Sequence, residues 1–221
     1  RVVRRVGAVP TRWSLRGSEM YDLGPPLDVA VEEGSNLLLS GPALTGKKQL
    51  AFEILSAGVR NGDGAIVVSN TDGAKRVFED LGDRIDYTDR PVAVVDCVTR
   101  QQGGEVRDDT RVRYTSSPVD MTGVGIKFSE LLEEFYEHQG VEHNRVFLDS
   151  LSTLLMYSDL QTVFRFLHVF TGRVQSVDGL GLYAIDSSAH DDKTMNTLKQ
   201  LFDGVIETHE DGEPTANLPG R

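Results

Sequence analysis

The segment from position 36 to position 59 constrains the fold of this chain more than any other. The apolar run Asn36-Leu37-Leu38-Leu39 is typical of a buried strand. The residues from Gly41 to Lys47 then fit the pattern G-x-x-x-x-G-K. A helix is expected from about Lys48 to Val59, with an apolar face made of Leu50, Ile54 and Leu55. Strand, glycine loop and helix in this order form a cradle for phosphate, because backbone N–H groups and the helix N-terminus both favour anions.

The loop and the first helical turn supply the candidate nucleotide-binding residues. Glycine permits the tight turn and the close approach of a ligand to the backbone. Lys47 would reach the β- and γ-phosphates. A glycine-rich turn with a surface lysine is the alternative at this point. The candidate residues are Gly41, Pro42, Ala43, Leu44, Thr45, Gly46, Lys47, Lys48 and Gln49.

Lys48 departs from the usual pattern, in which a serine or threonine follows the lysine and its hydroxyl ligates Mg²⁺. An ammonium group cannot ligate a cation, so it either repels Mg²⁺ or replaces part of its charge. Two interpretations stay open. In one, nucleotide binds with little or no dependence on magnesium. In the other, Lys48 points to solvent and water completes the magnesium shell.

The rest of the chain alternates short apolar strands with amphipathic helices, which predicts an α/β fold with a parallel sheet covered by helices. We expect one domain over residues 21–210, a basic N-terminal extension over 1–20 and a C-terminal tail over 211–221. Residues 99–111 are expected to form a polar loop. Further strands are expected at 65–69, 92–96, 112–114, 146–148, 180–185 and 204–207. Further helices are expected at 71–81, from 120 or 122 to 138, 160–174 and 191–202.

Asp149 ends the apolar strand that begins at Val146. Parallel strands bring their carboxyl ends to one edge of a sheet, so Asp149 is expected near the phosphate loop. There it could hold a magnesium-bound water, with Ser150 orienting its carboxylate. The alternative is that Asp149 caps a following helix.

Composition narrows the functional classes. The formal net charge is −11, which disfavours contact with nucleic-acid backbones over most of the surface. The single cysteine, Cys97, allows no internal disulfide, and no apolar run is long enough to cross a bilayer. A cytoplasmic protein without a membrane segment is expected. An acidic chain richer in arginine than in lysine suits a salt-rich cytoplasm, and an ordinary acidic cytosolic protein is the alternative.

These features resemble the RecA superfamily, and most closely its KaiC-like ATPases of archaea. The stretches from Val31 to Pro42, from Asp149 to Ser152 and from Phe202 to Ile206 resemble the family's phosphate-loop strand, Walker B strand and late strand. Residues 116–123 and 151–170 resemble a KaiC-like group of salt-loving archaea. The resemblance covers about Tyr21 to Glu210. It implies a three-layer RecA-like P-loop NTPase core that binds ATP with Mg²⁺.

The resemblance also assigns catalytic positions. The family's phosphate-loop lysine corresponds to Lys47, and its metal-binding Walker B aspartate corresponds to Asp149. Its two catalytic glutamates correspond to Thr71 and Asp72. Threonine cannot take a proton from water near neutral pH, and aspartate is one methylene shorter than glutamate. A misplacement near 1 Å can cost about 10²-fold in rate. Asp72 and Asp149 are therefore the catalytic candidates of a site with relaxed demand for hydrolysis.

Polar residues after the expected strand at 180–185 give two further hypotheses. Ser187 and Ser188 lie where RecA-like folds often keep a sensor of the γ-phosphate, and the alternative is a turn. His190-Asp191-Asp192 favours the start of a helix over a metal site, because adjacent side chains rarely converge on one ion.

Four functions follow from this pattern. The leading hypothesis is a regulatory or assembly module that binds ATP with weak or absent hydrolysis, in a homo-oligomeric ring or with a protein partner. The second is an active ring-forming ATPase with Asp72 as base. The third is a recombinase-like protein that binds single-stranded DNA through residues 99–111 or through the basic segment from Arg1 to Arg16. It is not favoured, because residues 99–111 mix arginines with acids. The fourth is a fold remnant with an empty site.

Overall fold

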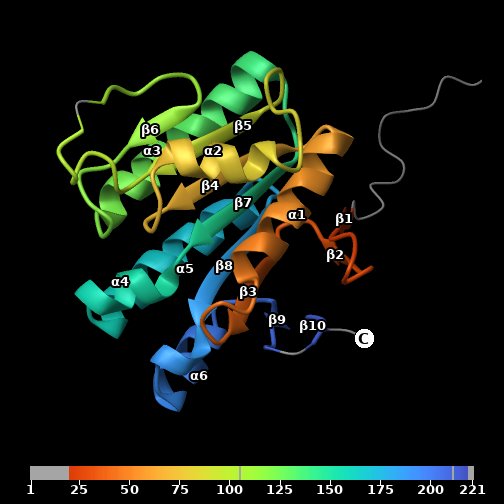
Figure 1. Ribbon diagram of the computed structural model, residues 1–221, viewed down its shortest axis with the longest axis vertical. Helices are drawn as coiled ribbons and strands as arrows, with labels where there is room; N and C mark the ends of the chain where they lie inside the picture. Colours follow the sequence, from red (N-terminus) through yellow and green to blue (C-terminus); the bar gives the residue numbers. More distant parts are fainter. Residues whose placement is uncertain (1–19, 105, 211, 219–221) are drawn as a thin grey trace, which may run out of the picture.

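The computed structural model describes residues 20–104, 106–210 and 212–218 (Figure 1). Of the basic extension expected over residues 1–20, residues 1–19 lie outside the described part, and Met20 begins β1. Within these ranges no helix combines the length and the apolar character that a bilayer crossing requires. The strands are β1 (Met20–Asp22), β2 (Ala30–Glu32), β3 (Asn36–Gly41), β4 (Gly64–Ser69), β5 (Val92–Asp96), β6 (Val112–Tyr114), β7 (Asn144–Asp149), β8 (Leu180–Asp186), β9 (Gly204–Glu207) and β10 (Thr215–Asn217).

The helices connect these strands and begin where local capping allows. Asp120, Asp159 and Asp191 each accept a hydrogen bond from a backbone N–H in the first turn of α3, α5 and α6. The helices are α1 (Lys47–Asn61), α2 (Ala74–Gly82), α3 (Met121–Glu133), the π-helical turn η1 (Glu134–His138), α4 (Leu151–Tyr157), α5 (Leu160–Ser176), the 3₁₀ turn η2 (Ser187–Ala189) and α6 (Asp192–Lys199).

The central sheet has eight strands in the order β10-β9-β3-β8-β7-β4-β5-β6. All neighbours pair in parallel except β10, which runs antiparallel to β9. The register aligns the carboxyl ends of the central strands. Gly41 lies opposite Asp186, and Ser69 lies between Asp149 and Asp96. One edge of the sheet therefore collects the ends of β3, β8, β7, β4 and β5.

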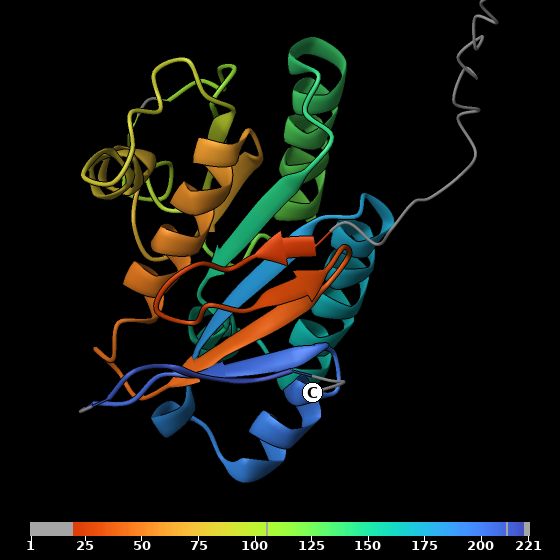
Figure 2. The same cartoon turned by 90° about the vertical axis from the view of Figure 1, so that its right-hand side faces the viewer.

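Helices cover both faces of the sheet, and Figure 2 shows the three layers edge-on. Alternate residues of β3 enter different cores: Leu37 and Leu39 pack with α1 and α2, whereas Leu38 packs with α3, α4, α5 and α6. Since both faces are buried, the strands are continuous apolar runs, as is typical of parallel sheets. The predicted α/β architecture with a mostly parallel sheet is thus confirmed.

Several boundaries differ from the sequence-based expectation. α2 begins at Ala74, because the Ala74 N–H is bound by the Asp96 carboxylate and the chain bends at residues 70–72. The expected helix to position 138 ends its regular turns at Glu133 and continues as one π-helical turn. α4 and the hairpin of β1 and β2 were not predicted, because α4 has only seven residues and the two strands pair with each other outside the central sheet. β10 lies within the segment expected as a tail.

Arg145, at the start of β7, fastens the β1–β2 hairpin to the core. Its residue exposure is 3%, and its Nε donates to Asp63 Oδ2 at 2.7 Å. Its Nη1 donates to the carbonyl oxygens of Asp22 at 2.8 Å and Ile54 at 2.9 Å. A buried guanidinium must have its donors satisfied, so these contacts tie β1, α1 and β7 together.

Gly58, in α1, leaves room for this guanidinium. A Cβ there would lie 2.1 Å from Arg145 Nε and 2.5 Å from Arg145 Cδ. We expect Gly58→Ala to destabilise the protein by about 1–3 kcal/mol, because the pinned arginine cannot move aside. Gly172→Ala in α5 is the matched control. Nothing lies within 4 Å of its added Cβ, so a gain of about 0.4–1 kcal/mol is expected. Urea unfolding measures both, and equal gains would contradict this account.

Candidate functional site

The loop between β3 and α1 turns tightly at the place where the sequence predicts a phosphate cradle. Leu44 and Gly46 adopt positive φ angles of 64° and 83°, and the side chain of Leu44 is fully exposed. At Gly41, an added Cβ would lie 2.2 Å from Thr208 Oγ1, so only glycine fits. Thr45 Oγ1 donates to the Pro42 carbonyl oxygen at 2.8 Å and lies 2.6 Å from Thr208 Oγ1. The loop is therefore tied to the end of β9.

Lys47 folds back over this loop. Its Nζ donates to the carbonyl oxygens of Gly41, at 2.8 Å, and of Pro42. Burial lowers the pKa of Lys47, while the nearby carboxylates of Asp186 and Asp149 act in the opposite direction. A partly desolvated ammonium held over this loop is well placed to meet an anion.

Lys48 enters a cluster of carboxylates on the other side of the loop. Its Nζ forms an ion pair with Asp72 Oδ2, and it lies 3.5 Å from Asp149 Oδ2 and 4.0 Å from Asp80 Oδ2. The Thr71 hydroxyl donates to the same Asp149 oxygen at 2.8 Å. Both candidate catalytic residues, Asp72 and Asp149, are thus brought together around one lysine.

The neighbours of Asp149 are held by Asn70, a residue that the sequence analysis did not single out. Asn70 Nδ2 donates to the Ser150 carbonyl oxygen at 3.1 Å, and the Ser150 N–H donates to Asn70 Oδ1 at 2.6 Å. The expectation that Ser150 orients the aspartate is wrong. Its hydroxyl instead accepts from the Thr153 N–H at 3.3 Å and caps α4, so neither does Asp149 cap that helix. Thr71 orients the carboxylate.

The residues after β8 form a turn rather than an open sensor. The Ser188 N–H and hydroxyl both donate to Asp186 Oδ1, at 3.0 and 2.6 Å. This hydroxyl contact lowers the pKa of Asp186; burial opposes the shift, and Lys47 and His190 support it. His190 Nε2 lies 2.9 Å from Ser152 Oγ, and Asp191 caps α6. Among the described residues, no three His, Cys, Asp or Glu side chains are arranged to hold a metal ion.

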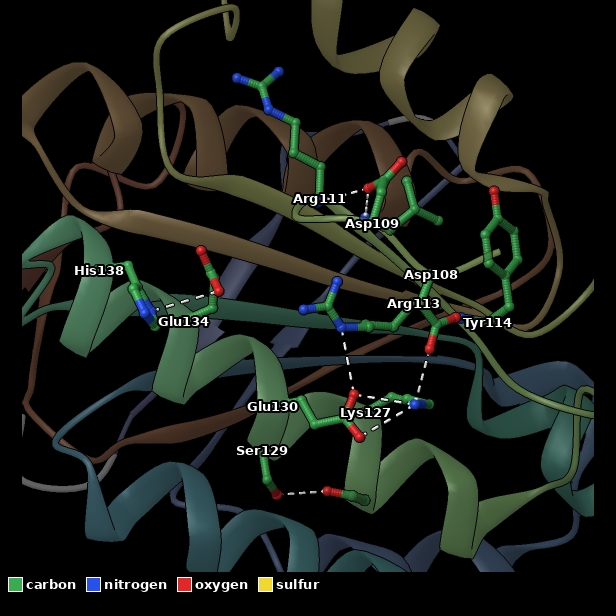
Figure 3. Close-up of polar contacts among 12 residues, drawn as sticks. Asp108, Asp109, Arg111, Arg113, Tyr114, Lys127, Ser129, Glu130, Glu134 and His138 are labelled. Atoms are coloured by element: carbon green, nitrogen blue, oxygen red, sulfur yellow. Dashed lines mark hydrogen bonds and ion pairs between the residues drawn. The ribbon is translucent and has the colours of Figure 1, made fainter. Parts of the chain in front are cut away.

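The loop between β5 and β6 is held to α3 by an ion pair between Asp108 and Lys127. Figure 3 shows Lys127 on α3 between Asp108 and Glu130, at 2.9 and 3.0 Å, and Arg113 Nε 3.4 Å from Glu130. Burial raises the pKa of Asp108, but its contacts with Lys127 and with the Tyr114 N–H outweigh burial and lower it overall. Arg111 donates instead to the carbonyl oxygens of Tyr87 and Thr88. Lys127, Arg111 and Arg113 are thus engaged within the protein, whereas Arg100 and Arg107 of this loop are exposed.

The structure thus gathers Lys47, Lys48, Asp72 and Asp149 at one edge, while Ala43, Leu44 and Gln49 are exposed around it. Sequence reasoning missed Asn70, Asp80 and Thr208. Asn70 directly follows a buried strand and Thr208 a half-buried one, and that position was a usable signal. Asp80 lies in the last turn of α2, and only the packing of α2 on α1 brings it near Lys48.

Comparisons with known proteins agree with this fold. A KaiC-like protein, PH0186, from the hyperthermophilic archaeon Pyrococcus horikoshii is similar with a TM-score of 0.54 and 10% identity, over 85% of this chain and 81% of that chain. The uncharacterized protein PH0321 from Pyrococcus horikoshii, in complex with an unknown peptide, is similar with a TM-score of 0.62 and 16% identity, over 86% and 85%. At these identities the likeness concerns the fold, and it confirms the predicted KaiC-like RecA architecture.

No curated protein matches this chain in sequence. One family model does match, over residues 34–208, which reach from before the phosphate loop to beyond β9. Its description is "Family of unknown function (DUF7504)". Because the match covers most of the chain, this protein belongs to the DUF7504 family.

Proposed function

We propose that this protein binds ATP in the loop from Gly41 to Lys48 and acts as a nucleotide-dependent regulatory or assembly module with weak or absent hydrolysis. The observation that carries the proposal is that two adjacent lysines have different sets of contacts. Lys47 lies over the loop that would hold the phosphates, whereas Lys48 occupies the carboxylates that would drive hydrolysis.

Weak hydrolysis is supported by the environment of the only candidate base. A general base must have a lone pair directed at the attacking water. The Asp72 carboxylate instead forms an ion pair with Lys48, and its backbone N–H donates to Ser69 Oγ at 3.1 Å. Thr71, at the other expected base position, uses its hydroxyl proton on Asp149. These contacts disfavour the alternative of an active ATPase.

A regulatory role is supported by the hydrogen bond that links the loop to the end of β9, which pairs with the outermost strand β10. Thr45 and Thr208 share a hydrogen bond, and Thr208 directly follows β9. Lys47 binds two loop carbonyl groups that it would exchange for phosphate oxygens on nucleotide binding. A change in the loop would thereby reach β9 and the edge strand β10, where a homo-oligomeric or protein partner could respond. Differential contacts in two states are what such a switch requires.

The first test of this proposal is Lys47→Ala. Losing a charged donor to phosphate commonly costs about 1.5–3 kcal/mol, so ATP affinity should fall at least about tenfold. Isothermal titration calorimetry measures the affinity. Lys75→Ala in α2 is the matched control, because the Lys75 side chain is 91% exposed. Equal affinity of both variants and the wild type would remove the basis of the proposal.

A second test concerns turnover. Phosphate release at saturating ATP should be far below the roughly 1–100 s⁻¹ of working phosphoryl-transfer enzymes such as kinases. Asp72→Asn should leave this residual rate unchanged, because Asp72 is engaged by Lys48 rather than by water. Asp83→Asn, at an exposed position after α2, serves as control. Substantial turnover that Asp72→Asn abolishes would establish the active ATPase instead.

A further inference from the structure

We infer that Lys48 is a built-in counter-ion that takes the place of Mg²⁺, so that the site accepts a nucleoside triphosphate free of metal. This inference rests on the proposed nucleotide binding and specifies the chemical form of the ligand. It follows from where the Lys48 ammonium lies and from what the surrounding oxygen atoms already bind.

Lys48 is held from several sides. Its ammonium contacts Asp72 after β4, Asp149 at the end of β7 and Asp80 on α2. The Nζ atom also lies 5.5 Å from the centroid of the Phe52 ring, one helical turn along α1. Only 24% of the Lys48 side chain is exposed. The interpretation in which Lys48 points to solvent is therefore wrong.

The residues present do not fit Mg²⁺. This ion needs near-octahedral oxygen ligands at about 2.0–2.1 Å. A lysine at position 48 supplies three donors and no acceptor. Asp149 Oδ2, the oxygen expected to approach the metal, accepts from the Thr71 hydroxyl and faces the Lys48 ammonium. A divalent cation in the same space would meet one positive charge and would have to displace two contacts.

The same geometry offers a substitute for the charge of the metal. Lys47 and Lys48 are adjacent in the first turn of α1, so both ammonium groups start from the helix end that adjoins the loop. The Lys47 ammonium donates to loop carbonyl groups, and the Lys48 ammonium forms an ion pair in the cluster of carboxylates. A triphosphate carries enough negative charge to be stabilised by both lysines and by the N–H groups at the start of α1.

The experiment compares ATP affinity in EDTA and in excess Mg²⁺ by isothermal titration calorimetry on the full chain. For the wild type, affinity in EDTA should equal or exceed that in magnesium. Lys48→Thr restores the usual hydroxyl and frees Asp149. It should bind weakly in EDTA and gain at least about tenfold on addition of Mg²⁺, the size expected for a charged contact. Lys75→Thr, on the exposed face of α2, should behave like the wild type.

The outcomes separate this inference from the function on which it rests. If the ATP affinity of the wild type falls about tenfold or more in EDTA, the inference of a built-in counter-ion is overturned, but nucleotide binding stands. Absence of ATP binding in both conditions, by a protein that circular dichroism shows to be folded, overturns both. A folded Lys48→Thr variant that gains nothing from magnesium overturns the role of Lys48. The comparison of wild-type affinity in EDTA and in magnesium needs no substitution, so it tests the inference even if Lys48→Thr does not fold.

Discussion

The parallel pairing of β3, β8, β7, β4 and β5 is the constraint on which the rest of the molecule depends. Buried backbone N–H and C=O groups must be paired, and the parallel register that pairs them also brings every carboxyl end to the same edge. Gly41 and Asp186 meet there, as do Ser69 and Asp149. The polar residues that continue from these ends are therefore neighbours in space, although they are far apart in the chain.

This constraint explains which parts of the molecule could be predicted from the sequence. The central strands are uninterrupted apolar runs, and the loop from Gly41 to Lys47 has fixed residues at fixed spacing, so the parallel α/β fold was recognisable. β1, β2 and α4 were not, because β1 and β2 depend on pairing with each other in a separate two-stranded sheet and α4 is only seven residues long. β10 depends on pairing with β9, which a local pattern does not report.

The candidate site divides in the same way. Lys47 and Asp149 were assigned by motif and strand end, and the structure brings them to one edge of the sheet. The roles of Ser150 and Thr71 could not be foreseen. Both have hydroxyls within reach of local partners, and only the tertiary arrangement decides that Ser150 caps α4 while Thr71 binds Asp149. The destination of the Lys48 side chain, between α1 and α2, depends equally on how those helices pack.

The buried guanidinium of Arg145 affects how the protein unfolds. If the β1–β2 hairpin detached alone, Arg145 would lose its hydrogen bond to the Asp22 carbonyl oxygen, and its guanidinium would remain partly buried with one donor unsatisfied. The cost of a buried charge with a missing partner opposes such local fraying. Amide hydrogens of this short hairpin should therefore exchange with solvent on the timescale of the sheet's cooperative opening, rather than at the fast rate usual near the edge of a domain.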